Sequence, residues 1–340
     1  MSEAGYLVVT AQRASDLIYE LCAQSAQDIR PGVWPGIWPG IWIVPDNVCP
    51  AVPLALACAG ADLRFVDIAA ESLCLDTNKV AELAKKEHIA GVVYVRTFGM
   101  GAFAQNDLTN LRAVLPDAIL IDDCCIGIPQ TQMPETQNAA DVILYSTGYG
   151  KTLDLGGGAY GFFKSDMGFK AGVQALAAQA FEALLTQSNE AIKGRVPVFA
   201  NYNFTAPGFS VEGIPPAQDW LEYCKSIKMQ LPDRLAQKAK LNAIYANGLA
   251  PFSPLSDDFQ NWRFHIFVQN QEQVLEALFS AGLFASNHYS SVSKLWDLKP
   301  GIVSQKIEKN IINLFNDQHF SAKQARQAVA IINEIGKPLR

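Results

Sequence analysis

Short apolar runs alternate with amphipathic segments along the first half of the chain. The runs have the length and composition of buried strands, and the segments between them repeat their apolar positions at helical spacing. The strands predicted in this way are 41–44, 63–66, 91–95, 118–121, 142–145 and 159–163, and the helices are 14–26, 50–59, 78–87 and 108–114. Because strands and helices alternate, we expect an α/β fold with a mainly parallel sheet and helices on both of its faces.

The pattern changes after Lys170. An irregular segment rich in Asn, Pro and Gly covers residues 195–216. Around it the spacing predicts helices over 171–187, 218–249, 272–281 and 321–335, and one strand over 262–269. We therefore expect a large domain over residues 1–216 and a smaller C-terminal α+β lobe over residues 217–340.

A Trp-Pro-Gly repeat with a period of four residues occupies positions 34–42. Pro and Gly favour turns, so the repeat predicts a loop that enters the strand at Ile41. Two roles remain open for it: a recognition motif, or a stiff hydrophobic loop that covers a core edge or a dimer surface. The second role is favoured.

Composition excludes several classes of function. The net charge is −6 and no dense Lys/Arg cluster occurs, so we expect no nucleic-acid or anionic-membrane surface. The most apolar long segment, 41–60, contains Asp46, Asn47 and three prolines, which argues against a transmembrane helix. The first ten residues show no basic region followed by an apolar stretch, so we expect no secretory signal. Seven cysteines without a CxxC pair and four scattered histidines argue against disulfides and a metal site, so we expect a reduced, cytoplasmic protein.

Three polar residues stand at the ends of neighbouring predicted strands. Asp123 follows the run 118–121, Ser146 follows the run 142–145, and Lys151 comes five residues after Ser146. Ligands of parallel sheets bind beyond these strand ends, so the three side chains should meet in one crevice. A pyridoxal phosphate (PLP) site needs these groups: a lysine for the Schiff base, a carboxylate for the ring nitrogen and a hydroxyl for the phosphate. Since adjacent strand residues point to opposite sides, only one of Asp122 and Asp123 should face the crevice.

Two further anion sites are suggested by short motifs. Gly150-Lys151-Thr152 matches the end of a phosphate-binding loop of nucleotide hydrolases. However, Tyr145 stands where that motif needs its first glycine, and no helix is predicted after Thr152, so this hypothesis is disfavoured. Gln12 and Arg13 precede the first predicted helix, whose N-terminus could bind a phosphate or could be an ordinary surface helix start.

With these residues in place, the chain resembles the DegT/DnrJ-type aminotransferases. These are PLP enzymes with the aspartate-aminotransferase fold (PLP-dependent transferase type I), and many of them act on nucleotide-linked keto sugars. The segments that carry the resemblance are 39–45, 57–67, 121–125, 146–151, 156–158, 202–204 and 287–289. The resemblance implies a homodimer with a shared active site, an amino acid donor such as glutamate, and a keto sugar as acceptor.

The resemblance also implies roles for individual residues. Lys151 is the catalytic lysine and Asp123 binds the ring nitrogen. The remaining implied contacts are Ser146, Gln12, Arg13 and the partner subunit's Asn203 at the phosphate, Cys49 where a ring-stacking aromatic is expected, and His288 and Tyr289 near the substrate.

The chain departs from the family pattern at the walls of the expected site. Ala11-Gln12-Arg13 replaces a Ser-Gly-Thr, Cys49 replaces the stacking aromatic, and Ile126 replaces a polar side chain. These changes motivate an alternative hypothesis, a degenerate homologue that binds PLP, or only a partner, without transaminase activity. Arg263 could bind a substrate carboxylate, but we expect it on the surface.

Overall fold

A seven-stranded sheet forms the centre of the molecule. The computed structural model describes residues 5–25, 40–135, 137–194, 196–204, 208–212, 219–252 and 255–339. The sheet order is β1-β7-β6-β5-β4-β2-β3. Its strands are β1 (Tyr6–Ala11), β2 (Ile41–Pro45), β3 (Asp62–Val66), β4 (Ile89–Val95), β5 (Ile119–Asp123), β6 (Val142–Ser146) and β7 (Ala159–Lys164).

The strands β6, β5, β4, β2 and β3 are parallel to one another, and β7 runs antiparallel to both of its neighbours, β6 and β1. This arrangement confirms the expected α/β fold and every strand predicted for the first half of the chain. β1 was not predicted, because its alternation of buried and exposed positions is short. Positions 34–39 of the Trp-Pro-Gly repeat lie outside the described residues, so neither role of the repeat is tested.

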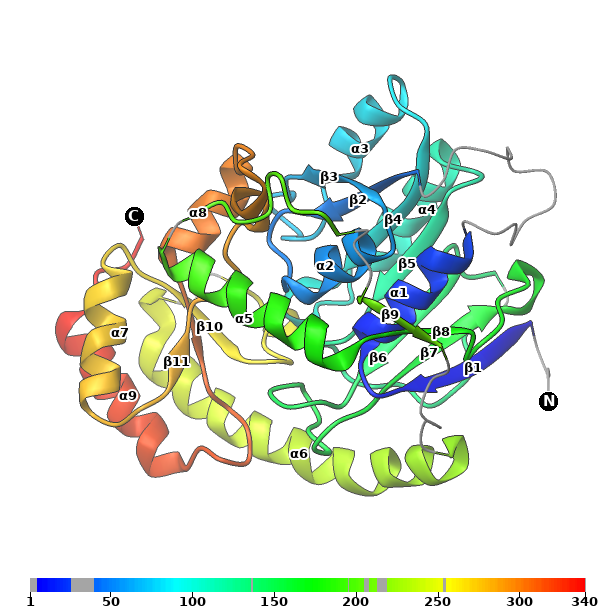
Figure 1. Cartoon of the computed structure of the whole chain (residues 1–340). Helices are drawn as coiled ribbons and strands as arrows, with labels where there is room; N and C mark the ends of the chain where they lie inside the picture. Colours follow the sequence, from blue (N-terminus) through cyan, green and yellow to red (C-terminus); the bar gives the residue numbers. More distant parts are fainter. Residues whose placement is uncertain are drawn as a thin grey trace.

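Helices cover both faces of the sheet (Figure 1). One face is packed by α1 (Ala14–Ser25), α2 (Ala51–Cys58) and α5 (Ala178–Gly194). The other face is packed by α3 (Thr77–Ala84), α4 (Ala104–Val114) and the first turns of α6 (Trp220–Leu249). The two apolar layers bury both sides of the central strands, which is why these strands read as continuous apolar runs.

A second, antiparallel sheet belongs to the C-terminal part, with the order β10-β12-β11. The elements of this part are α7 (Gln271–Ser280), α8 (Ile302–Asn310), α9 (Ala322–Ile335), β10 (Phe264–Phe267), β11 (Ala285–Ser286) and β12 (Ile311–Leu314). The second half of α6 packs with α7 and α9 into a separate apolar core. A smaller α+β unit is therefore present, as expected. The predicted boundary at residue 217 falls within 213–218, outside the described residues, and stays a prediction.

One predicted helix begins later than expected. Residues Gln174–Leu176 form strand β8, which pairs with β9 (Ser210–Glu212), so α5 starts only at Ala178. Gly172 precedes β8 with a φ of 86°, a conformation that favours glycine and breaks helical spacing. Short 3-10 turns occur at Thr97–Gly99, Ser165–Met167, Ala250–Phe252, Asp257–Phe259 and Val292–Trp296.

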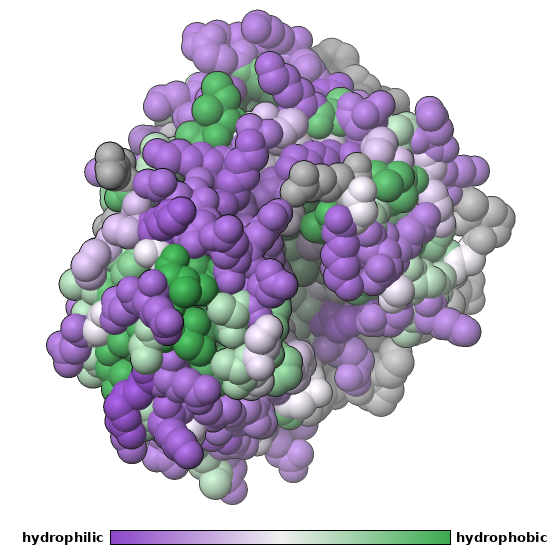
Figure 2. Space-filling model, turned by 90° about the vertical axis from the view of Figure 1, so that its left-hand side faces the viewer, coloured by the Kyte–Doolittle hydropathy of each residue, from purple (hydrophilic) through white to green (hydrophobic). Residues whose placement is uncertain are grey.

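The outer face of the C-terminal part is mainly hydrophilic, with small separate hydrophobic groups (Figure 2). Scattered exposed apolar side chains are normal on a protein surface. Within the described part of the chain, each helix is too short or too polar to cross a bilayer.

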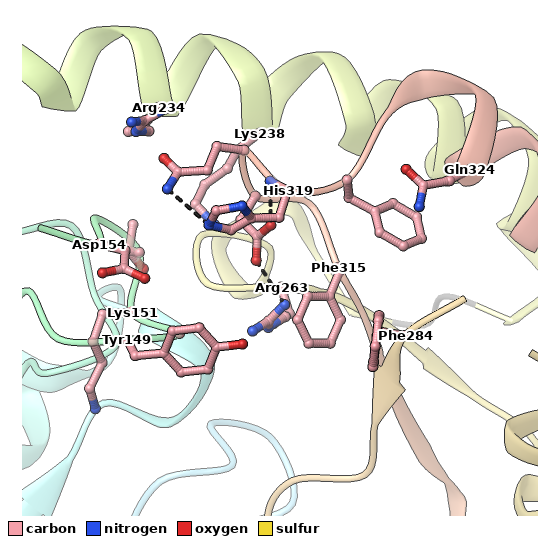
Figure 3. A pocket seen from close by; sticks show the side chains of 15 residues that line it. Tyr149, Lys151, Asp154, Arg234, Lys238, Arg263, Phe284, Phe315, His319 and Gln324 are labelled. Atoms are coloured by element: carbon pink, nitrogen blue, oxygen red, sulfur yellow. Dashed lines mark hydrogen bonds and ion pairs between the residues drawn. The ribbon is translucent and has the colours of Figure 1, made fainter. Parts of the chain in front are cut away.

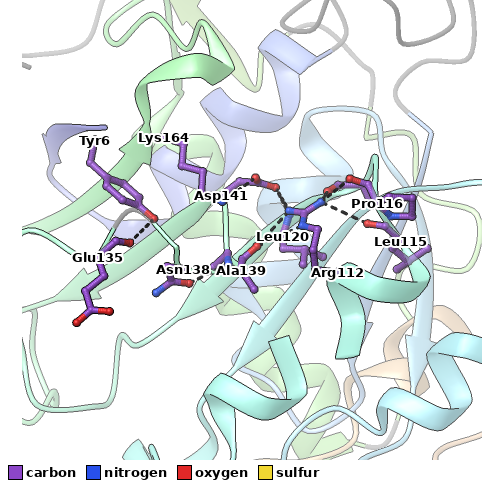
Figure 4. A network of polar contacts seen from close by, with 12 residues as sticks. Tyr6, Arg112, Leu115, Pro116, Leu120, Glu135, Asn138, Ala139, Asp141 and Lys164 are labelled. Atoms are coloured by element: carbon purple, nitrogen blue, oxygen red, sulfur yellow. Dashed lines mark hydrogen bonds and ion pairs between the residues drawn. The ribbon is translucent and has the colours of Figure 1, made fainter. Parts of the chain in front are cut away.

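A polar network fixes the starts of β5 and β6 side by side (Figure 4). The carboxylate of Asp141, just before β6, accepts hydrogen bonds from the Leu120 backbone (2.9 Å) and from the Arg112 guanidinium (2.5 Å). Arg112 also donates to the carbonyl oxygens of Leu115, Pro116, Ala118 and Ala139. Because the strand starts are held in register, Asp123 and Ser146 at their ends are placed at the same edge of the sheet.

Candidate active site

Lys151 lies in the loop between β6 and β7, at the C-terminal edge of the parallel strands. Its backbone N–H donates to the Gly148 carbonyl at 3.2 Å, which closes a tight turn. The Trp262 indole N–H donates to the Gly150 carbonyl at 2.6 Å. Gly150 has a φ of 73°, which favours glycine. The lysine loop is thus tied to the C-terminal lobe immediately before Lys151.

The two acids at the end of β5 have different surroundings. Asp122 is fully buried and receives two hydrogen bonds from Arg96, at 2.9 Å from Nε and 2.6 Å from Nη2. Asp123 is also buried and accepts a hydrogen bond from the Cys125 backbone at 2.9 Å. Burial raises the pKa of Asp123, while the bonds from Cys125 and the charge of Lys151 act in the opposite direction. Asp123 is therefore the acid that interacts with Lys151, and Asp122 is held by Arg96.

Ser146 lies next to the N-terminus of α1. Its hydroxyl donates to the Gly158 carbonyl at 3.3 Å and accepts the Gly148 N–H at 3.4 Å. Gly158 in turn donates its N–H to the Gln12 carbonyl at 3.1 Å, two residues before α1 begins at Ala14. A hydroxyl and the positive end of a helix thus lie close together, which is the chemistry that holds a phosphate.

Arg13 already has negatively charged neighbours. Its guanidinium pairs with Asp16 at 3.2 Å and with Glu182 at 2.6 Å, and its backbone N–H donates to Asp16. Gln12 and Arg13 are absent from the lining of the pocket that holds Lys151. Any phosphate contact from this segment therefore depends on the backbone and on Ser146 more than on the charge of Arg13.

A pocket of about 890 Å³ opens above Lys151. It brings Lys151 together with five other residues singled out from the sequence, Cys49, Ile126, Arg263, His288 and Tyr289, whereas Asp123 is not part of the described lining. Ser146 and Asn203 are not part of the described lining, and Asn203 lies exposed beyond α5. Residues of this wall that sequence reasoning missed are Tyr149, Glu182, Asn189, Lys193 and Trp262.

Tyr289 is buried in the wall of this pocket. Its ring is stacked on Trp262, with centroids 5.8 Å apart and an interplanar angle of 8°. Burial raises the pKa of Tyr289 well above its ordinary value, and the nearby Cys49 and Asp123 raise it further. The phenol therefore stays protonated and can donate a hydrogen bond.

His288 stays neutral at physiological pH. It keeps part of its surface exposed, yet desolvation by the surrounding protein, followed by the positive charges of Arg263 and Lys151, lowers the pKa of His288 to about 4. Its backbone N–H donates to the Asn313 side chain at 2.7 Å, which holds the turn against β12. A neutral imidazole offers one donor and one acceptor to the pocket.

The expectation of a surface position for Arg263 was wrong. Its side chain is buried, pairs with Asp317 at 3.2 Å and lies 3.2 Å from the centre of the Phe315 ring. Burial lowers the pKa of Arg263, and Asp317 acts against this. The only sequence signal was the position of Arg263, a charged residue inside the mainly apolar run 262–268.

No helix follows Thr152 in the structure. Residues 152–158 form bends that lead into β7, and the Thr152 hydroxyl donates to the Ile126 carbonyl at 2.7 Å. A phosphate-binding loop of nucleotide hydrolases needs a helix N-terminus at this point. The geometry therefore gives that hypothesis no support.

Comparisons with known proteins bear on the fold. No family model matches the chain, and no curated protein matches it. Solved structures with the same fold include a DegT DnrJ EryC1 StrS aminotransferase from Brucella abortus, at 15% identity and a TM-score of 0.64 over 97% of this chain and 86% of that chain. PseC of Helicobacter pylori, an aminotransferase of pseudoaminic acid biosynthesis, gives 12% identity and a TM-score of 0.69 over 96% and 86%. NtdA of Bacillus subtilis with bound PMP has 16% identity and a TM-score of 0.64, over 97% of this chain and 74% of that chain.

These similarities confirm the fold that the sequence resemblance implied. The chain has the α/β fold of the DegT/DnrJ aminotransferases over nearly its whole length. At these identities the likeness establishes the fold, and the activity must be argued from the site.

Proposed function

We propose that the protein is a PLP-dependent aminotransferase that moves an amino group from an amino acid to a keto sugar. The observation that carries the proposal is the buried Asp123 carboxylate at the end of β5, electrostatically coupled to Lys151 beneath a pocket of about 890 Å³. A buried carboxylate and a lysine that lines the adjacent pocket are the two groups that a pyridoxal ring requires from its protein.

The residues present fit this cofactor. Asp123 is buried among apolar side chains, and its ionised form gains from a cation placed against it. A protonated ring nitrogen is such a cation. Ser146 and the start of α1 provide a hydroxyl and backbone N–H groups for the phosphate. When bound, PLP supplies an electron sink for the electrons of the bond that breaks at the substrate Cα.

Lys151 performs the proton transfer in this proposal. Its Nζ would hold the cofactor, and the same amine would accept and donate a proton at the substrate Cα. The hydrogen bond from Trp262 to Gly150 fixes the loop that carries this amine. Asp123 would hold the protonated ring nitrogen.

His288 and Tyr289 are the residues that we assign to the substrate. Both line the pocket, the first as a neutral imidazole and the second as a protonated phenol. Uncharged donors and acceptors suit the hydroxyl groups of a sugar. The pocket volume lies near the upper end of the roughly 300–1,000 Å³ usual for small-molecule sites, which suits an acceptor larger than an amino acid.

We further propose a homodimer with a shared active site. Asn203 is exposed and does not line the described pocket of its own chain. The resemblance implies that Asn203 contacts the phosphate bound by a neighbouring subunit.

The test uses the absorption spectrum of the purified full chain after incubation with PLP. We expect a visible band that glutamate or another amino donor removes. Lys151→Ala should abolish the band, whereas Lys193→Ala, which removes an exposed lysine from the same pocket wall, should keep it. A chain that stays colourless with excess PLP contradicts the proposal.

One observation favours a second candidate. The thiol of Cys49 lies in the pocket wall and offers no ring to stack on the cofactor. A degenerate homologue that binds PLP without transamination would give a coloured protein whose band no amino donor changes.

A further inference from the structure

A second, smaller pocket shares the lysine loop with the first (Figure 3). It has a volume of about 230 Å³ and lies between this loop, helix α6 and the turn that follows β12. Tyr149, Lys151, Arg263 and Phe315 line both pockets, and the amino end of Lys151 points away from α6. We propose that this pocket binds a small organic anion, a phosphate or carboxylate group attached to an apolar or aromatic body.

The lining is predominantly basic. The basic side chains Arg234, Lys238 and Arg263 face the carboxylates Asp154 and Asp317, whereas the amino end of Lys151 points away from them. An excess of positive charge in a recess with low-dielectric walls attracts anions.

Most of these charged groups have a structural partner. The Lys238 amine, whose pKa burial lowers to about 7, donates to the Trp262 carbonyl at 2.8 Å and to the Asn316 side chain at 2.9 Å. Asp317 is paired with Arg263. These internal contacts explain the charged groups of Lys238 and Asp317 without a bound ligand.

Arg234 is different. It lies one helical turn before Lys238 on the same face of α6, and both side chains reach toward the pocket from the helix. Within the described part of the chain, its guanidinium makes no ion pair or hydrogen bond, and its Nε is buried without an acceptor. Asp154, the carboxylate of the lysine loop, accepts a backbone N–H from Gly156 instead. The buried Nε of this half-buried side chain lacks an acceptor among the described residues, and an anionic group bound in the pocket would supply one.

The Nε of Arg263 gives a second, independent indication. This atom is also buried without a partner among the described residues, although the Nη1 of the same side chain pairs with Asp317. Two guanidinium groups from different segments, α6 and the residue just before β10, thus keep donor capacity at one pocket. Arginine presents its donors in a planar fork that matches carboxylate and phosphate oxygens.

Aromatic side chains indicate the body of the ligand. The rings of Tyr149 and Phe284 line the pocket although they are 86% and 70% exposed, and Phe315 completes the apolar wall. The volume is below the roughly 300–1,000 Å³ of typical small-molecule sites, so the ligand is smaller than a nucleotide.

The anion has two possible sources. It is either a group of the substrate that reaches Lys151, or a separate metabolite whose binding acts on the lysine loop. Both sources share the chemistry of an anionic group beside an apolar body. Competition against the amino donor distinguishes them, because a substrate group is displaced by the donor and a separate ligand is not.

Calorimetry on the PLP-treated full chain at constant ionic strength tests the site, with phenyl phosphate, benzoate and the uncharged benzyl alcohol as probes. We expect phenyl phosphate or benzoate to bind with 1:1 stoichiometry and benzyl alcohol not to bind. Arg234→Gln should weaken binding of the anion at least tenfold, and Arg234→Lys should weaken this binding less. Lys240→Gln, which removes an exposed positive charge from the same helix outside the pocket, should leave the affinity unchanged.

Equal affinity in wild type and Arg234→Gln overturns the proposal, as does no anion binding to the wild type. Equal weakening by Lys240→Gln also overturns it, because that result shows binding to the general charge of the helix. The unfolding midpoint of each variant checks folding, and because Arg234 is only half-buried and makes no hydrogen bond or ion pair among the described residues, loss of folding is not expected. Because the readout is binding of the probe, it does not depend on whether Lys151 holds a cofactor.

Discussion

Removal of the Arg96 guanidinium tests the different assignments of the two acids at the end of β5. In the variant Arg96→Met, the fully buried Asp122 carboxylate loses hydrogen bonds of 2.9 and 2.6 Å. The apolar stem of the side chain is largely kept. The remaining carboxylate is then buried without its cation, next to Cys124 and the sheet interior.

The expected cost is about 3–5 kcal/mol. Breaking a buried pair by removal of one partner costs about this amount. Two hydrogen bonds to a charged group, at about 1.5–3 kcal/mol each, give a similar figure. Because Arg96 keeps 26% of its side-chain surface exposed, the lower part of the range is expected.

The assay is urea unfolding of the wild type, Arg96→Met, Asp122→Leu and the double variant. The double variant replaces the pair with apolar side chains, so it should recover at least half of the loss seen in Arg96→Met. A loss below about 1 kcal/mol in Arg96→Met would refute the reasoning. So would a double variant as unstable as the single one, because the buried carboxylate would then not be the cause.

Three further outcomes follow from the structure. Asp123→Asn should weaken PLP binding at least tenfold in a spectroscopic titration with little change in the urea midpoint. An equal loss of PLP binding in Asp122→Leu would contradict the assignment of Asp123 to the ring nitrogen. Gly91→Ala should destabilise the fold by about 1–3 kcal/mol in urea unfolding, because its Cβ would lie 2.6 Å from ring atoms of Trp42; an unchanged midpoint contradicts this packing. The pKa of His265 is lowered to about 3, mainly by burial, so the unfolded chain binds a proton that the folded chain does not, and stability should fall by about 2 kcal/mol from pH 8 to pH 5. Unfolding midpoints of His265→Gln should show a smaller decrease with pH, and an equal decrease would contradict the role of this residue.

The strands and helices of the first half were predictable because each carries its own signal. A fully buried strand such as β5 reads as an apolar run, and the acids at its end mark the edge of the sheet. β12 gave no comparable signal. It follows α8 directly, and its apolar residues continue the helix without a turn residue between them.

The residues of the candidate site also fall into two groups, those that the sequence predicted and those that it did not. Asp123, Ser146 and Lys151 were accessible to sequence reasoning because strand ends converge by topology. Arg263 was not, because its burial depends on Asp317, 54 residues later, and on the ring of Phe315. The partnership of Arg13 with Glu182, 169 residues apart, was equally hidden. Contacts of this kind arise from tertiary packing and leave no local pattern.

Lys151 as the attachment point of PLP is the central claim, and borohydride reduction tests it most directly. The full chain is incubated with PLP, reduced, digested and mapped by mass spectrometry. We predict that the added mass of the reduced cofactor lies on the peptide containing Lys151 at one equivalent per chain, and that Lys151→Ala carries none. Modification spread over exposed lysines such as Lys193, or unchanged in Lys151→Ala, would contradict the account.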